Sequence, residues 1–355
     1  MAITNFEQLD LNTDVTTTRT LLHESIPLTG TIYLNATGAY SDNNIKNFTH
    51  GMFQSVYDYP YLSSSANHIF DITVGYDEDS DLSGSSSTQN AKKINMYNEF
   101  SQTLLGYTGS NNRVRRFELD TVLDSTGSCQ AGFFLNFSRL ITKDQIKKGT
   151  FSITLGAGAW ASPFSQVVTL TDASASENGG TLNTLGGDYG LLYDTGSFVR
   201  GLVFYQAGVA FLSTSSFGAG EGGTDGSVST FYMPAGSPVG PQTLAQVMTG
   251  SAITGACDAA RHRIQNISFN NTTEINSTIY FCRVPHNRYN HSANPTYLSS
   301  SQIRVKSVAS DSPLAFITTV GLYDSNNELL AVAKLSEPLR KDPTNEITLR
   351  VRLDY

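Results

Sequence analysis

The chain has little charge. Charged residues make up only 15% of its 355 residues, and the formal net charge is −8. Solvent-facing positions must therefore be covered largely by Ser, Thr, Asn and Gly, whereas the surface of a cytosolic enzyme is normally rich in Lys and Glu. This composition is typical of a protein whose surface is mostly covered by neighbouring subunits, or of one that must survive outside a cell. The negative net charge argues against a broad basic face for nucleic acid, so we expect no nucleic-acid partner.

Cysteines and long apolar runs are also scarce. The three cysteines, Cys129, Cys257 and Cys282, form no CxxC or zinc-type spacing, so we expect free thiols and no disulfide framework. The N-terminal MAITNFEQLD lacks the basic and apolar segments of a signal peptide. No stretch approaches the roughly 18 apolar residues of a membrane helix. We expect a protein that is made in a cytoplasm and does not insert into a membrane.

The common catalytic motifs are missing as well. The sequence has no Gly-Lys dipeptide, and therefore no phosphate-binding loop, and no G-x-S-x-G, S-x-x-K or H-E-x-x-H. The run from Gly218 to Gly223 matches G-x-G-x-x-G, but Thr-Asp-Gly-Ser follows it in place of a helix that could hold pyrophosphate. We expect a non-enzymatic protein with no cofactor and no small-molecule substrate.

Two polar clusters invite comparison with metal sites, and both are incomplete. The acidic run from Asp77 to Asp81 imitates the start of a calcium loop, but Leu82 replaces the required Gly and Thr88 the bidentate acid. We expect a solvated loop there, with weak cation binding as the alternative. His286 and His291 have no third ligand nearby. For them we expect a loop that Asn and His side chains hold by hydrogen bonds to its backbone, and no metal.

Thirty glycines and abundant Ser and Thr favour β structure with many turns. The fold class that we expect is mainly β with a few short helices (α+β), built from antiparallel sheets. Capping residues predict helices from Ser41 to Val56, from Asn90 to Gly106 and from Pro241 to Gly250. Apolar or alternating runs predict strands at 68–74, 115–123, 131–140, 151–155, 166–170, 190–193, 199–212 and 266–283, of which 199–212 is either one strand buried on both faces or a bent hairpin.

The C-terminal segment predicts a β-meander. Strand-like runs cover Leu314 to Tyr323, Leu329 to Leu335 and Glu346 to Leu353, and turn residues or prolines separate them. In the last run apolar residues alternate with polar ones, which places Arg350 and Arg352 on one face. These arginines can meet carboxylates of a neighbouring chain. We therefore name four candidate interaction residues: Arg288, His291, Arg350 and Arg352.

We expect three regions along the chain: an N-terminal mixed α/β region at 1–110, a β-rich central region at 111–280, and the C-terminal meander at 281–355. The last two can form one compact domain. No internal repeat of 20 to 50 residues is visible, which argues against a solenoid, a propeller or a repetitive fibre shaft.

Several segments resemble virion structural proteins of large contractile-tailed bacteriophages, especially those of marine and cyanobacterial hosts. The C-terminal segments are NRYNHSANPTYL (287–298), SQIRVK (301–306), FITTVGLYDSNNELLAVAKLSEPL (316–339) and LRVRLDY (349–355). The upstream segments are KKINMYNEFSQTLLGY (92–107), FFLNFSRLITKDQIKKGTFSITLG (133–156) and YGLLYDTGSFVRGLVFYQAGVAFL (189–212). The chain departs from the usual family form Glu-Phe-Asn-Tyr-Ser at 288–292, where it has Arg-Tyr-Asn-His-Ser.

The resemblance implies a structural component of a tailed-phage virion, in the tail, the baseplate or an adjacent tail part. Its expected partners are other virion structural proteins and copies of itself, and its expected location is the virion. The family has no catalytic residues to transfer. The alternatives are a receptor- or glycan-binding tail fibre or adaptor module, and a structural protein of the capsid or neck.

Overall fold

The chain divides into two compact units. The computed structural model describes residues 6–28, 42–84, 88–108, 113–124, 127–176, 181–217, 231–232, 240–292, 298–299, 302–303, 308 and 310–355. Unit 1 comprises Met1–Leu21 and Glu274–Tyr355, and unit 2 comprises Leu22–Thr273. This division differs from the three expected regions. Residues on both sides of position 110 belong to one sheet, because β4 (His68–Tyr76) pairs along its length with β7 (Ala131–Phe137).

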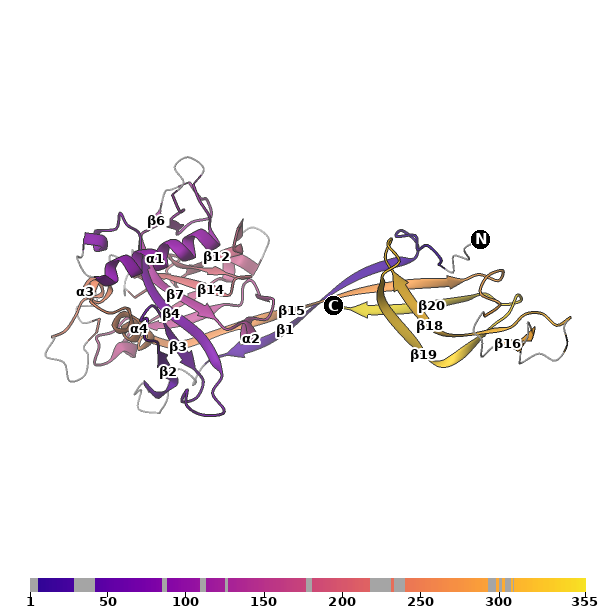
Figure 1. The fold of residues 1–355 in the computed structure, drawn as a ribbon. Helices are drawn as coiled ribbons and strands as arrows, with labels where there is room; N and C mark the ends of the chain where they lie inside the picture. The colour runs from indigo at the N-terminus through magenta and orange to yellow at the C-terminus, as the bar shows by residue number, and fades with distance from the viewer. Residues whose placement is uncertain are drawn as a thin grey trace. The chain divides into compact units, whose positions relative to one another are not determined.

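A large antiparallel sheet forms the frame of unit 2 (Figure 1). Its path runs β1-β15-β9-β10-β12-β13-β14-β7-β4-β3-β2. The bounds of its strands are β2 (Ile45–Asn47), β3 (Gln54–Tyr57), β9 (Ser152–Gly156), β10 (Val167–Thr171), β12 (Gly187–Tyr193), β13 (Val199–Phe204) and β14 (Val209–Ser213). Short strands β8 (Gln145–Ile146) and β11 (Thr181–Thr184) pair with β15 and β12, while β5 (Phe117–Glu118) pairs with β6 (Ser128–Cys129). The expected mainly-β, antiparallel fold class is confirmed.

Apolar residues on both faces of the central strands make the core of unit 2. Phe134 of β7 stacks on Phe100 of α1 (Thr88–Leu104), with ring centroids 4.4 Å apart. The next residue back, Phe133, belongs to a second cluster with residues of α3 (Leu244–Thr249) and α4 (Ile253–Arg261). Successive residues of a strand point to opposite faces, so helices cover both sides of this sheet. The apolar run 199–212 is accordingly the hairpin β13–β14, and its strand residues are almost all buried.

Helix α1 packs closely on β4 because β4 contains a glycine at the contact. A Cβ atom at Gly75 would lie 2.8 Å from the backbone nitrogen of Tyr97 and 3.0 Å from the carbonyl oxygen of Lys93. The helix ends where expected, since Gly106 has a φ of 85° and its N–H donates to the carbonyl of Ser101.

The expected helix from Ser41 to Val56 is wrong. Asp42–Asn44 forms a single 3-10 turn (η1), and β2 and β3 follow it as a hairpin in which Ile45 lies opposite Val56. Gly51, between the strands, has a φ of 64°, which a helix does not accept. The strand expected at 115–123 is also wrong beyond its two residues in β5. Ser41 itself and the glycine-rich run 218–223 lie outside the described residues.

Unit 1 contains the predicted C-terminal meander, which is confirmed. β18 (Ala315–Tyr323) pairs with β19 (Leu329–Lys341), and β20 (Ile347–Asp354) pairs with β15 (Ile264–Val284). Strand β15 and strand β1 (Val15–Pro27) contribute residues to both units. A short pair, β16 (Leu298–Ser299) with β17 (Gln302–Ile303), completes the described strands of this unit.

Strand β19 is longer than the sequence suggests, because it continues through Pro338 to Lys341. The ladder pairs Ile317 with Leu339 but Thr319 with Lys334, so residues 335–338 oppose a single residue of β18. This irregularity accommodates the proline, whose missing N–H removes no ladder hydrogen bond there.

The two units differ in how they bury apolar side chains. Among the described residues, both core clusters consist entirely of unit 2 residues. Among the described apolar residues of unit 1, only Val284 and Ala315 are buried. In β20 the apolar residues are half-buried and alternate with exposed polar ones. Unit 2 therefore has a self-contained core, whereas the described part of unit 1 does not.

We predict that Gly75→Ala destabilises the protein by about 1–3 kcal/mol, because the added methyl group must displace the backbone of α1. Gly255→Ala in α4 is the matched control. A Cβ atom there meets nothing within 4 Å, so the helix interior should gain roughly 0.5–1 kcal/mol. Urea unfolding of both variants measures the sign of each change in the free energy of unfolding. A neutral or stabilising Gly75→Ala would contradict the close packing.

Candidate functional site

Two of the four candidate interaction residues lie on the exposed face of β20. Arg350 and Arg352 are both exposed and share the face that the alternation predicts. The Nε of Arg352 donates to Asp354 at 2.7 Å, and its Nη2 donates to the hydroxyl of Ser277 at 3.0 Å. Arg350 has no side-chain hydrogen bond or ion pair with any residue that the structure describes. It is available to a group outside the described chain.

The other two candidates lie in the loop that follows β15. Arg288 forms an ion pair with Glu7 at 2.5 Å, and His291 is exposed. As expected, an asparagine holds this loop, since the Nδ2 of Asn290 donates to the carbonyl of His286 at 2.8 Å. Within the described part of the chain, no hydrogen bond or ion pair joins Arg288 or His291 to the arginines of β20. The four residues therefore form two positions and not one site.

Sequence reasoning missed Lys341, which anchors the same loop. Its side chain is fully buried, and its Nζ donates to Asn290 Oδ1 at 2.6 Å and to the carbonyl of Asp342 at 2.8 Å. The available signal was strand parity: Lys341 lies two residues after the half-buried Leu339 and so points to the same side of β19.

The hairpin of β18 and β19 exposes apolar side chains. Tyr323 lies opposite Leu329, and Gly321 lies opposite Val332. Leu329, Leu330 and Val332 are 53%, 63% and 49% exposed. We call Tyr323, Leu329, Leu330 and Val332 the hairpin patch. Contiguous exposed apolar residues of this kind mark interaction surfaces more often than solvated ones.

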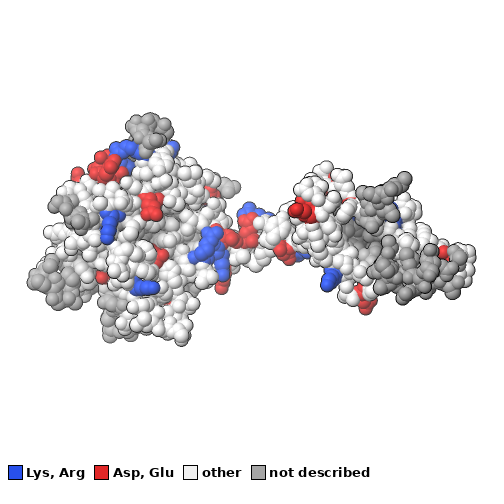
Figure 2. All heavy atoms as spheres, viewed as in Figure 1, with Lys and Arg blue, Asp and Glu red and all other residues white. Residues whose placement is uncertain are grey.

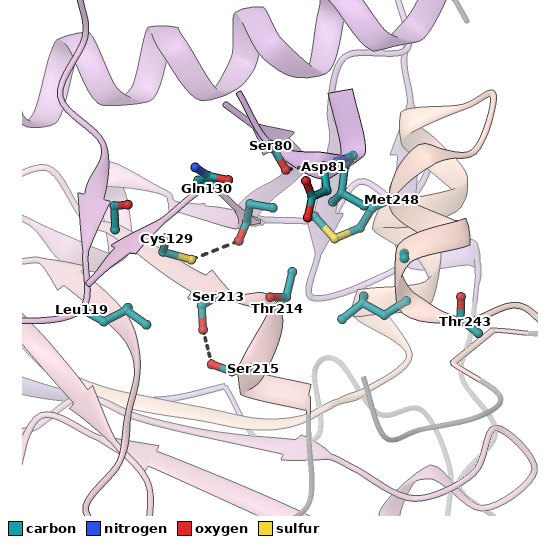
Figure 3. A pocket seen from close by; sticks show the side chains of 15 residues that line it. Ser80, Asp81, Leu119, Cys129, Gln130, Ser213, Thr214, Ser215, Thr243 and Met248 are labelled. Carbon is teal, nitrogen blue, oxygen red and sulfur yellow. Dashed lines mark hydrogen bonds between the residues drawn. The ribbon is translucent and has the colours of Figure 1, made fainter. Parts of the chain in front are cut away.

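Unit 2 has a pocket of about 480 Å³ (Figure 3). Its lining comes from the turn around Ser80 and Asp81, the start of β7, the end of β14 and helix α3. Hydroxyl and amide groups face Met248 and other apolar residues across it. Its volume is in the range of small-ligand sites.

The polar groups of the pocket are engaged with one another and with the backbone. Ser213 Oγ donates to the carbonyl of Arg200 at 2.6 Å and lies 2.7 Å from Ser215 Oγ. Cys129 Sγ donates to the carbonyl of Ala131 at 3.2 Å. The described lining residues include no histidine or lysine, and Asp81 is their one acidic residue.

Glu118, Asp120 and Asp124 form a carboxylate cluster beside β5. One ligand oxygen of each lies within 4.8 Å of the others, and only Glu118 is buried. Carboxylates are the ligands that hard cations prefer, but calcium takes six to eight oxygens. The backbone N–H of Asp124 already donates to Glu118 at 2.9 Å. The cluster is thus a partial ligand set whose members also organise the turn.

The acidic residues from Asp77 to Asp79 form one ion-pair network with Arg113 and Arg116, which lie more than 30 residues away in the sequence. Arg113 pairs with Glu78 and Asp79, and Arg116 pairs with Asp77 and Asp79. The hydrogen bond from Arg113 is the main reason that the pKa of Asp79 lies below its ordinary value. Glu78 and Asp79 remain more than half exposed, as expected for a solvated loop, and the two arginines offset part of its negative charge. Elsewhere charges are sparse, as Figure 2 shows for one face of the molecule.

We predict that Arg116→Met destabilises the protein more than Arg113→Met does. The side chain of Asp77 is 4% exposed, so losing Arg116 leaves a buried carboxylate without its cation, at a cost of about 1–3 kcal/mol. Arg113 faces carboxylates that are half exposed, and its loss should cost less than about 1 kcal/mol. Urea unfolding midpoints measure both changes. Equal losses would show that burial of Asp77 does not matter.

Lys93 of α1 is a fully buried cation near the end of α3. Its Nζ donates to the carbonyls of Met248 at 2.5 Å and Gly250 at 2.7 Å, where the negative end of the helix dipole favours a cation. Burial lowers the pKa of Lys93 to about 8 from 10.5. Through these two hydrogen bonds Lys93 joins α1 to the end of α3.

The lowered pKa of Lys93 makes stability depend on pH. Between pH 8 and 10.5 the unfolded chain binds a proton that the folded chain has released, so the free energy of unfolding should rise with pH across this window. Lys93→Met should lack that rise, whereas Lys92→Met, which removes a less buried lysine, should keep it. The free energy of unfolding is measured as a function of pH for the wild type and for each variant. Subtracting the variant's values from those of the wild type cancels the titration of other groups. Parallel curves for wild type and Lys93→Met would contradict the prediction.

Comparison with family models, curated proteins and solved structures finds no match to this chain. None of the helices that the structure describes combines the length and the apolar character needed to cross a bilayer.

Proposed function

We propose that this protein is a non-enzymatic structural component of a tailed-bacteriophage virion, in the tail or baseplate, that acts through protein–protein contacts. The observation that carries the proposal is that unit 2 has a self-contained core, whereas the described part of unit 1 has none and exposes the hairpin patch. The resemblance of most of the chain to virion proteins and its low charge content support the same function.

The physical argument concerns unit 1. Isolated hairpins are marginally stable in water, and a small domain needs a buried apolar face to offset the loss of chain entropy. The described strands of unit 1 have apolar positions that are only half-buried, and β18 and β19 carry further apolar residues that are exposed. Neighbouring chains of an assembly can cover such positions, as in obligate complexes whose interfaces resemble a domain core.

The proposal predicts that charge in the hairpin patch prevents incorporation. In Leu329→Asp/Val332→Asp, both altered side chains are exposed, so the chain should remain folded and soluble. Its recovery in particles should fall at least roughly tenfold, because a carboxylate buried at an interface is strongly unfavourable. The measurement is complementation of a phage that lacks this gene, followed by gradient purification of particles and of separated tails.

The matched control is Leu62→Asp, an exposed apolar residue (85%) in unit 2. It should be incorporated normally and should be found with the tail fraction. Normal incorporation of the double variant would reject the hairpin patch as an assembly surface. Wild-type protein absent from purified particles would reject the proposed function itself.

A further inference from the structure

Strand β20 has one paired edge and one open edge, and the hydrogen bonds show which residues face each. The N–H of Asn276 donates to the carbonyl of Tyr355 at 3.0 Å, and the N–H of Tyr355 donates to the carbonyl of Asn276 at 2.8 Å. Tyr355 is therefore in a hydrogen-bonded pair with β15. Because this pairing alternates along an antiparallel ladder, the odd-numbered residues of β20 direct their backbone groups to β15.

The same alternation can be checked on β15. Phe281 lies opposite Arg350, an even-numbered position, so its backbone should point away from β20. Its N–H indeed donates to the carbonyl of Asp14, in the segment that leads into β1, at 2.8 Å. The even-numbered residues of β20 consequently direct their backbone groups to the opposite edge. No described strand pairs with β20 along that edge.

The exposed side chains along β20 carry complementary charges. Glu346, the residue directly before β20, and Arg350 are four residues apart, and both are exposed. Neither has a side-chain hydrogen bond or ion pair with a residue that the structure describes. Thr348 lies midway between them. An open edge with an acid and a base placed symmetrically about one residue is complementary to a second copy of itself.

We propose that two copies of this chain pair antiparallel along β20, about a two-fold axis at Thr348. Each Glu346 then lies opposite the Arg350 of the other copy, and outward-facing backbone groups meet outward-facing ones. Isologous contact of this kind is the usual form of a symmetric dimer. Pairing by strand addition is a common use of an open edge.

Charge and existing contacts disfavour the two-fold registers centred on the residues that follow Thr348. An axis at Arg350 would place this arginine opposite the Arg350 of the other copy. An axis at Val351 would place it opposite the Arg352 of the other copy. Like charges directly opposite each other destabilise a strand pair. An axis at Leu349 would pair Glu346 with Arg352, which Asp354 and Ser277 already hold. The axis at Thr348 satisfies both unpartnered charges.

The inference rests on the proposed function and deepens it by naming the partner as a second copy. Charge reversal tests the register in the full-length purified chain, with self-association measured by analytical ultracentrifugation. Arg350→Glu and Glu346→Arg should each weaken self-association at least roughly tenfold, since each places like charges opposite one another. An equimolar mixture of the two variants, and the double variant Glu346→Arg/Arg350→Glu, should both associate like the wild type. Lys334→Glu, an exposed position on β19, is the control for charge alone and should change little.

A cross-link tests the axis directly. In a hydrogen-bonded pair the Cα atoms are about 5.5 Å apart, a separation that a disulfide can span. Thr348→Cys should form a covalent dimer under mild oxidation, whereas Thr318→Cys, which is exposed on β18, should not. If Thr348→Cys cross-links no faster than Thr318→Cys, or if the mixed variants fail to associate, the proposed pairing is wrong.

The two proposals fail separately. A chain that stays monomeric at all concentrations but is still incorporated into particles would overturn the pairing along β20 and leave the proposed function intact. A chain that dimerises with the predicted charge pattern but is absent from particles would overturn the proposed function and leave the pairing along β20 intact.

Discussion

The burial of aromatic rings on both faces of β7 is the interaction on which unit 2 depends. Phe134 stacks on Phe100 of α1, while Phe133 packs in the cluster that includes α3 and α4. Lys93 then joins α1 to the end of α3 through two carbonyls. The core of unit 2 is thus closed on both sides of its central strands. The described part of unit 1 has no comparable core, and the apolar residues of its strands are mostly half-buried or exposed.

Unit 1 has two surfaces through which it can bind a partner. The hairpin patch can bury apolar area, and the open edge of β20 can add backbone hydrogen bonds and the pair Glu346–Arg350. Natural proteins usually protect exposed strand edges with charge or proline, since an open edge pairs with whatever strand is available. In the proposed register unlike charges lie opposite each other, whereas axes at Arg350 and Val351 would oppose like charges, so the charges on β20 restrict pairing without preventing it.

Local patterns were sufficient for much of the fold. The period of two in 346–353 predicted the exposed arginines of β20, and helical spacing with a closing glycine predicted α1 to within two residues at each end. The same reasoning failed at Ile45 and Val56. Their spacing fits one helix face, but it equally fits two strands that face each other across a hairpin.

Contacts between distant segments could not be predicted from one sequence. Arg116 and Asp77 are each unremarkable until the fold brings them to 2.8 Å, and Lys341 resembles a surface lysine until the loop after β15 covers it. The pocket in unit 2 has lining residues from five separate segments, and no motif links them. For the candidate interaction residues, the sequence predicted exposure only on β20, where strand parity alone decides it.

The central claim is that assembly completes unit 1. Hydrogen exchange of residues 315–354, compared between the dilute free chain and assembled particles, tests it most directly. In the free chain the amide of Thr348 should exchange quickly, while that of Leu349, which faces β15, should exchange slowly. In particles both amides and those of the β18–β19 hairpin should be protected. Equal exchange in the two states would contradict the account, because unit 1 would then remain uncovered after assembly.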